Sequence, residues 1–91
     1  MTEKQKMLAG QLYDAADAEL VAERMAAAAW MARYNAEAAA PTEERLRLLR
    51  EQLAEAGDGS EVRPPFHCDY GGNISIGRGV FLNFNCVILD V

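Results

Sequence analysis

The sequence is poor in the residues that most often carry chemistry. Its 91 residues include one histidine, one tryptophan and only two cysteines. A single histidine and two widely spaced cysteines fit no zinc-binding pattern, and no Ser-His-Asp arrangement can be recognised. We therefore predict no metal site and no serine-type nucleophile in this chain.

Long apolar runs and an excess of basic residues are also lacking. No segment approaches the roughly 18 consecutive apolar residues of a membrane span, and the amino terminus has no apolar stretch typical of a signal peptide. The net charge is −5, and no basic stripe is present, which argues against a nucleic-acid partner. We expect a cytoplasmic protein with no membrane partner and no nucleic-acid partner.

The first two-thirds of the chain carry three helical patterns. We expect helices over about residues 2–13, 18–39 and 43–56, with Asp17 as the N-cap of the second and Thr42 as the N-cap of the third. Each helix has one apolar stripe, and three such short helices bury too little area to be stable alone. The predicted stripes are Met7, Leu8 and Leu12; Val21, Met25, Ala28 and Ala32, flanked by Trp30, Met31 and Tyr34; and Leu46, Leu49, Leu53 and Ala56, with Leu48 beside them.

A six-residue period dominates the last third of the chain. Two ladders carry it: Ile76, Leu82 and Ile88 in the first, and Cys68, Ile74, Val80 and Cys86 in the second. This period is typical of a parallel β-helix built from hexapeptide repeats, in which the chain turns a corner every six residues. An open coil leaves unpaired backbone at its end, so we expect the chain to be the front part of a longer protein.

The two cysteines give this interpretation a geometric consequence. If one turn of the coil takes three sixes, Cys68 and Cys86 lie over each other, about 4.8 Å apart. In a reducing cytosol we expect two buried thiols there, with a disulfide as the alternative.

The chain therefore divides into a helical part, residues 1–57, and the start of a β-helix, residues 62–91. A glycine-rich loop and the Pro64-Pro65 pair mark the boundary. The predicted fold class is α+β: an N-terminal cap of about three helices, followed by the first one to two coils of a parallel β-helix.

Four further stretches run through the whole chain in order: Glu3–Tyr13, Arg33–Asn35, Phe66–Ile74 and Asn83–Val91. Together they resemble the maltose/galactoside O-acetyltransferases, a family of hexapeptide-repeat acyltransferases. The resemblance implies a left-handed β-helix, truncated here, a homotrimer, and transfer of acetyl from acetyl-CoA to a hydroxyl of maltose, glucose or a galactoside.

The resemblance implies no catalytic residue within this chain. The family's general base is a histidine beyond Val91, and His67 lies in a different coil. Most of the acetyl-CoA groove is built by later coils, so no residue is assigned to acetyl-CoA. In the whole enzyme, the histidine would take the proton of the acceptor hydroxyl, which attacks the thioester directly. We expect the 91-residue chain alone to be inactive.

The resemblance also implies five sugar-binding residues: Asp17, Arg24, Asp69, Phe81 and Asn83. Asn83 matches an asparagine beside the reacting centre, where an amide can orient a hydroxyl and donate to a carbonyl oxygen. Arg24 matches an arginine that reaches the acceptor, and its fork suits vicinal hydroxyls. Asp69 stands where galactoside relatives carry a sugar-contacting serine, and Phe81 stands where some relatives carry tyrosine.

Each of the five has a structural alternative. Asn83 can fill a coil corner, Asp69 can solvate a turn, and Phe81 can meet a neighbouring subunit. Arg24 can be a solvated helix residue, and Asp17 can be no more than an N-cap.

The second functional hypothesis is non-catalytic. In it the chain is a helical interaction module, which binds a partner or a full-length homologue through its apolar stripes and its open coil edge. Strand addition at a sheet edge is a general binding mode.

Overall fold

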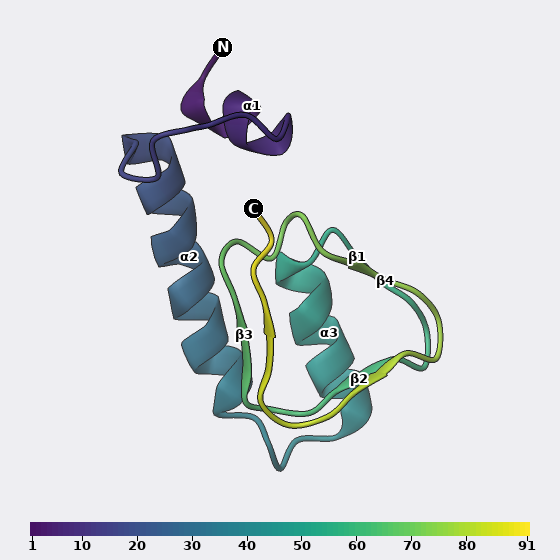
Figure 1. Ribbon diagram of the computed structural model, residues 1–91. Coiled ribbons are helices and arrows are strands. Elements are labelled where there is room, and N and C mark those ends of the chain that lie inside the picture. Colours follow the sequence, from purple (N-terminus) through teal and green to yellow (C-terminus); the bar gives the residue numbers. More distant parts are fainter.

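The computed structural model describes residues 1–91 and shows an α+β fold, in which three helices precede six short strands (Figure 1). The helices are α1 (Glu3–Leu8), α2 (Ala18–Asn35) and α3 (Thr42–Gln52). The strands are β1 (Glu55–Ala56), β2 (Glu61–Val62), β3 (Phe66–Cys68), β4 (Ser75–Ile76), β5 (Phe81–Leu82) and β6 (Cys86–Ile88). This order agrees with the predicted α+β class.

The strands wind into a coil whose second turn pairs with its first. β1 pairs with β4, β2 with β5 and β3 with β6, always in parallel. The partners are offset by 20 residues throughout: Glu55 with Ser75, Glu61 with Phe81, and Phe66 with Cys86. Figure 1 looks along the coil, with the sheets as its sides and α3 across the space between them. The left-handed sense of winding stays a prediction.

The residues of both six-residue ladders face the interior of the coil. Their members are buried in the main hydrophobic cluster or pack against it: Cys68, Ile74, Ile76, Val80, Leu82, Cys86 and Ile88. The outward positions between them are exposed, and Val87 on β6 is 60% exposed. The alternation of a β-strand, with successive side chains on opposite faces, explains this division.

The expected stacking of Cys68 over Cys86 is wrong. Cys68 pairs with Ile88, and Cys86 pairs with Phe66, because one turn takes 20 residues rather than 18. The two additional residues lie in the corner between β3 and β4, residues 69–73. Both cysteines are free thiols; Cys68 is buried and Cys86 is half-buried.

The first two helices end earlier than predicted. α1 ends at Leu8, and Gly10 follows in the left-handed region with φ of 75°. Leu12 therefore lies outside the helix and is 98% exposed. α2 ends at Asn35, whose side chain turns to the backbone of Phe66: Nδ2 donates to the carbonyl oxygen (3.1 Å), and Oδ1 accepts from the N–H (2.8 Å).

The buried face of α2 also differs from the predicted stripe. Its buried residues are Leu20, Ala27, Trp30 and Tyr34, whereas Met25, Ala28 and Ala32 are exposed and Val21 is half-buried. The helix is rich in alanine on every side, so its apolar pattern does not single out one face. The predicted N-cap is confirmed, since the Asp17 carboxylate accepts from the backbone N–H groups of Glu19 and Leu20.

α3 is shorter than expected and begins differently. Its N-cap is Pro41, without a side-chain hydrogen bond, so the prediction of Thr42 as the cap is wrong. It ends at Gln52, because the next residues pair with the second turn: the N–H of Ala54 donates to the carbonyl of Ile74 (2.9 Å). The strands thus begin at Glu55, inside the predicted helix. The division at residues 57 and 62 stays a prediction about domains, and the two parts share one core.

The helices cover the starting edge of the coil and satisfy part of its backbone. The Tyr34 hydroxyl donates to the carbonyl of Val62 (2.5 Å), and Arg50 Nε donates to the carbonyl of Ala56 (2.9 Å). Asn35 serves both backbone groups of Phe66, as described above. Unpaired backbone in a sheet edge needs such partners, so α2 and α3 close this end of the coil.

The structure contains neither a candidate membrane-spanning helix nor a candidate metal-binding cluster. None of the three helices combines the length and the apolar character that crossing a bilayer requires. The His, Cys, Asp and Glu side chains form no group of three or more that could hold a metal ion.

Candidate functional site

The enlarged corner between β3 and β4, residues 69–73, is the best-defined polar structure in the molecule. Gly71 has φ of 83°, a left-handed conformation that glycine adopts without strain. The carboxylate of Asp90 lies inside the corner. Its Oδ1 accepts from the N–H groups of Asp69 (3.1 Å) and Tyr70 (2.9 Å), and its Oδ2 accepts from that of Asn73 (3.2 Å).

Two further contacts fix the same corner. Asn73 Nδ2 donates back to the carbonyl oxygen of Asp90 (2.9 Å), and Gln52 Nε2 donates to that of Tyr70 (2.5 Å). Asp90 comes from the second turn of the coil, and Gln52 ends α3. The corner is therefore held from both neighbouring layers.

Arg24 of α2 reaches this corner through Tyr70. Arg24 Nη1 donates to the Tyr70 hydroxyl (2.8 Å), and Nη2 donates to the carbonyl oxygen of Ala15 (2.6 Å). The guanidinium carbon lies 5.9 Å from the centroid of the Tyr70 ring, within cation–π range. These bonds engage two of the five N–H donors of the guanidinium.

A small cavity of about 220 Å³ lies beside Tyr70, between α1, α2 and the corner. An ion pair between Lys4 and Glu23 (2.6 Å) stands at its α1–α2 side. The lining residues are Lys4, Glu23, Ala26, Gln52, Tyr70, Gly72 and Asn73. The apolar side of Tyr70 packs in a separate small cluster with Met7 and Leu20.

The structure gathers three of the five predicted site residues near this corner. Arg24 and Asp69 flank Tyr70, and Asp17 follows the loop whose Ala15 carbonyl binds Arg24. Asp17 itself caps α2. Asn83 stands before the start of β6, whereas Asp69 follows the end of its partner β3.

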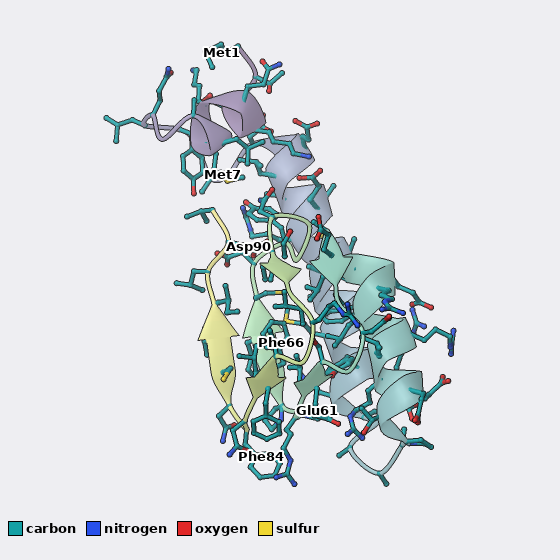
Figure 2. All side chains as sticks on the ribbon, turned by 90° about the vertical axis from the view of Figure 1, so that its right-hand side faces the viewer. Met1, Met7, Glu61, Phe66, Phe84 and Asp90 are labelled. Carbon is teal, nitrogen blue, oxygen red and sulfur yellow. The ribbon has the colours of Figure 1, made fainter.

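Phe81 and Asn83 therefore lie elsewhere on the coil. Phe81 is 57% exposed on β5, and the Asn83 side chain accepts from the N–H of Phe84 (2.8 Å). Figure 2 shows the separation, with Phe84 near the start of β6 and Asp90 beyond its far end. Within one chain, the predicted residues do not form a single site.

The corner contains no activated nucleophile. Burial, with smaller effects from the carboxylates of Asp90 and Asp69, raises the pKa of the Cys68 thiol to about 11. A thiol with a raised pKa is a poor nucleophile near neutral pH. His67, beside it in the chain, has an exposed side chain. What the corner offers is the guanidinium donor of Arg24 and the carboxylate acceptor of Asp69, which suit hydroxyl groups.

Tyr70, Asp90 and Gln52 are not among the five predicted sugar-binding residues. One feature of the sequence pointed to Asp90. It is a single carboxylate that comes directly after the apolar residues of the last strand, both those that face inward and those that face outward. A charged side chain in such a position needs several partners.

A parallel coil with a 20-residue turn, closed at its start by helices, defines a class of protein built from hexapeptide repeats. The sequence pattern described as the maltose acetyltransferase hexapeptide capping motif matches residues 6–57. This chain therefore belongs to the hexapeptide-repeat acetyltransferases that carry the maltose acetyltransferase capping motif.

Individual relatives agree with this membership. Nodulation protein L of Rhizobium meliloti strain 1021 is 57% identical over 90 residues, which cover 99% of this chain and 49% of that protein. A maltose O-acetyltransferase from Clostridium difficile 630 is similar with a TM-score of 0.94 and 38% identity, over 99% of this chain and 48% of that one. A galactoside acetyltransferase in complex with coenzyme A is similar with a TM-score of 0.88 and 32% identity, and the match covers 99% of this chain and 45% of that one. This chain thus spans about half the length of the relatives it matches.

Proposed function

We propose that this chain is the N-terminal part of a sugar O-acetyltransferase, which transfers the acetyl group of acetyl-CoA to a hydroxyl of maltose, glucose or a galactoside. The observation that carries the proposal is the capping-motif match over residues 6–57. The whole protein would be a cytoplasmic homotrimer, and its coil a left-handed β-helix.

The residues of this chain would act on the acceptor side of the reaction. Arg24 and Asp69 would bind sugar hydroxyls at the corner, with Asp17 nearby. Asn83, just before β6, and Phe81, on β5, would contribute from another part of the coil. In a trimer, corners of different subunits can combine, which would reconcile these two locations.

Acetyl-CoA is proposed as the acetyl donor because a structural relative is a complex with coenzyme A. The cavity beside Tyr70, at about 220 Å³, is smaller than the ~300–1,000 Å³ of usual ligand pockets. It does not fit so long a molecule. We therefore assign no residue of this chain to acetyl-CoA and no catalytic step to this chain alone.

The proposal is tested by thiol release from acetyl-CoA. The purified 91-residue chain, with glucose, maltose or a galactoside as acceptor, is expected to give no turnover above background. A form extended through the codons downstream of Val91 is expected to turn over, and a histidine in that extension is expected to be essential. Turnover by the 91-residue chain would contradict the proposed division of labour.

The alternative function is an interaction module that binds a partner or a full-length homologue. Large apolar side chains exposed on the second turn favour it, among them Phe81 (57%), Val87 (60%) and Leu89 (67%). A stop codon directly after Val91, with a 91-residue product that is stable in cells, would support this alternative. Further hexapeptides in frame would support the enzyme.

A further inference from the structure

Asp90 belongs to the second turn of the coil but serves the first. The amides that its carboxylate accepts from lie 17 to 21 residues earlier in the chain. It is 7% exposed, and Ser60 is the other buried polar residue. A buried carboxylate is tolerated where several donors surround it.

The corner needs these acceptors because of its length. The two additional residues take the backbone of residues 69–73 out of the strand ladder, so the N–H groups of Asp69, Tyr70 and Asn73 find no carbonyl partner in a neighbouring strand. The carboxylate replaces those partners. The direction of Tyr70 is thereby set by a residue of the next turn.

Tyr70 in turn holds Arg24. Its hydroxyl accepts from Nη1 at 2.8 Å, and the carbonyl of Ala15 accepts from Nη2 at 2.6 Å. Two fixed acceptors on different nitrogens define the plane of the guanidinium. One of the two acceptors depends on the corner and hence on Asp90.

We infer that Asp90 is a positioning residue for Arg24: its carboxylate fixes the corner, the corner fixes Tyr70, and the Tyr70 hydroxyl orients the guanidinium. Asp90 does not itself touch the acceptor in this arrangement. The consequence for acceptor binding rests on the proposed function, but the coupling between Asp90 and Arg24 does not.

The coupling can be measured in the 91-residue chain without any turnover. One readout is deuterium uptake of the peptide that contains residues 69–73. The other is the rate at which phenylglyoxal modifies Arg24, measured by mass spectrometry relative to the exposed Arg78 of the same molecule. The variants are Asp90→Asn, Tyr70→Phe and, as a matched control for loss of a carboxylate in another part of the coil, Asp58→Asn, whose side chain is exposed.

We expect Asp90→Asn to raise both the uptake of residues 69–73 and the Arg24-to-Arg78 ratio. The ratio should rise about fivefold, the factor that corresponds to the net loss of one hydrogen bond. Tyr70→Phe should raise the ratio alone, because the corner keeps its carboxylate. Asp58→Asn should change neither readout.

A corner that loosens in Asp90→Asn while the Arg24 ratio stays constant would overturn the inference and leave Asp90 a structural residue. If Asp90→Asn does not fold, Tyr70→Phe decides: an unchanged ratio shows that Tyr70 does not hold Arg24.

In an active extended form, Asp90→Asn should raise the KM for the acceptor and leave kcat and the KM for acetyl-CoA nearly constant. Coupling without this KM effect would refute the acceptor role of Arg24 and not the coupling.

Discussion

At the scale of single residues, close stacking of the two turns depends on glycine at position 57. A Cβ built there would lie 2.5 Å from the carbonyl carbon and oxygen of Gly77 and 2.6 Å from the nitrogen of Arg78. All three are backbone atoms, so relief requires the two turns to separate. Ser60 strengthens the same contact, since its hydroxyl donates to the Gly77 carbonyl (2.6 Å) and accepts from the Val80 N–H (3.1 Å).

Gly57→Ala is therefore expected to lower the free energy of unfolding by about 1–3 kcal/mol, the usual effect of overpacking. Urea unfolding, followed by the fluorescence of the single buried tryptophan, Trp30, measures this change. Gly72→Ala is the matched control, because a Cβ at Gly72 meets nothing within 4 Å. Equal stability of the two variants would contradict the close stacking.

The buried thiol makes a second prediction at this scale. Cys68 has a folded-state pKa of about 11, against an ordinary value of 9.0. Because the folded protein favours the neutral thiol, its stabilising effect is complete below pH 9 and is lost as the pH rises towards 11. The loss is about 2–3 kcal/mol.

The check is the free energy of unfolding between pH 8 and pH 11 in the wild type and in Cys68→Ala. The variant should decline less over this range. Burial likewise raises the pKa of Tyr34, from 10.0 to about 12, so both proteins should lose further stability above pH 10. Parallel curves up to pH 10 would show that Cys68 does not titrate as described.

At the scale of elements, α3 is bound to β2 by a largely buried ion pair. Arg45 contacts the carboxylate of Glu61, with Nε at 3.0 Å, and the Thr42 hydroxyl donates to the other oxygen (2.6 Å). Burial alone would raise the pKa of Glu61. The hydrogen bonds from Thr42 and Arg45 and the nearby positive charges outweigh burial, so that this pKa is lowered.

A carboxyl group with a lowered folded-state pKa stabilises the protein above its ordinary value of 4.5, and this contribution is lost as the pH falls through the folded pKa. We expect Glu61→Gln to cost about 1–3 kcal/mol at pH 7 and to flatten the loss of stability between pH 6 and pH 3. Glu51→Gln, which alters an exposed ion pair, should change stability by less than ~1 kcal/mol. Similar effects of the two substitutions at pH 7 would contradict the structural role of Glu61.

How far the sequence predicts these elements depends on how local their determinants are. The ladders from Ile76 to Ile88 were readable because each inward residue repeats within a few positions. The 20-residue length of the turn could not be predicted from the sequence, because the corner that lengthens the turn is stabilised by Asp90 from the next layer. The end of α3 at Gln52 was missed for a similar reason, since Ala54 exchanges helical bonds for pairing with Ile74, 20 residues later.

For the candidate site too, the residues that depend on contacts between layers of the coil were the ones not predicted. Arg24, Asp69 and Asp17 were predicted through resemblance, and the structure brings them near the corner between β3 and β4. Tyr70 and Asp90 were missed, because their roles arise from contacts across the layers. The buried face of α2 was predicted wrongly. The exposed Ala28 and Ala32 are the same residue type as the buried Ala27, so alanine does not show which face packs against the core.

At the scale of the whole molecule, the second turn of the coil is incompletely covered. Val62 and Phe66 of the first turn are each 1% exposed, whereas their partners Leu82 and Cys86 remain half-buried. The outward Val87 and Leu89 add exposed apolar area near the same edge. Unpaired strand edges and apolar patches promote association.

We therefore expect the 91-residue chain to self-associate at micromolar concentration, as measured by size-exclusion chromatography with light scattering. Val87→Lys places a charge on the outward face of β6 and should shift the population towards monomer. Leu12→Lys, at a more exposed leucine in the loop after α1, should not. A sharp monomer peak for the unmodified chain would contradict this prediction.

The closure of only one end of the coil also gives the fold a direction. Side chains of α2 and α3 terminate the first turn, so a new layer can be added only onto β4, β5 and β6. A ribosome delivers these parts in the same order: first the helices, then the turn they cover, then the next. Each completed layer can serve as a template for the one that emerges after it, so folding can keep pace with synthesis.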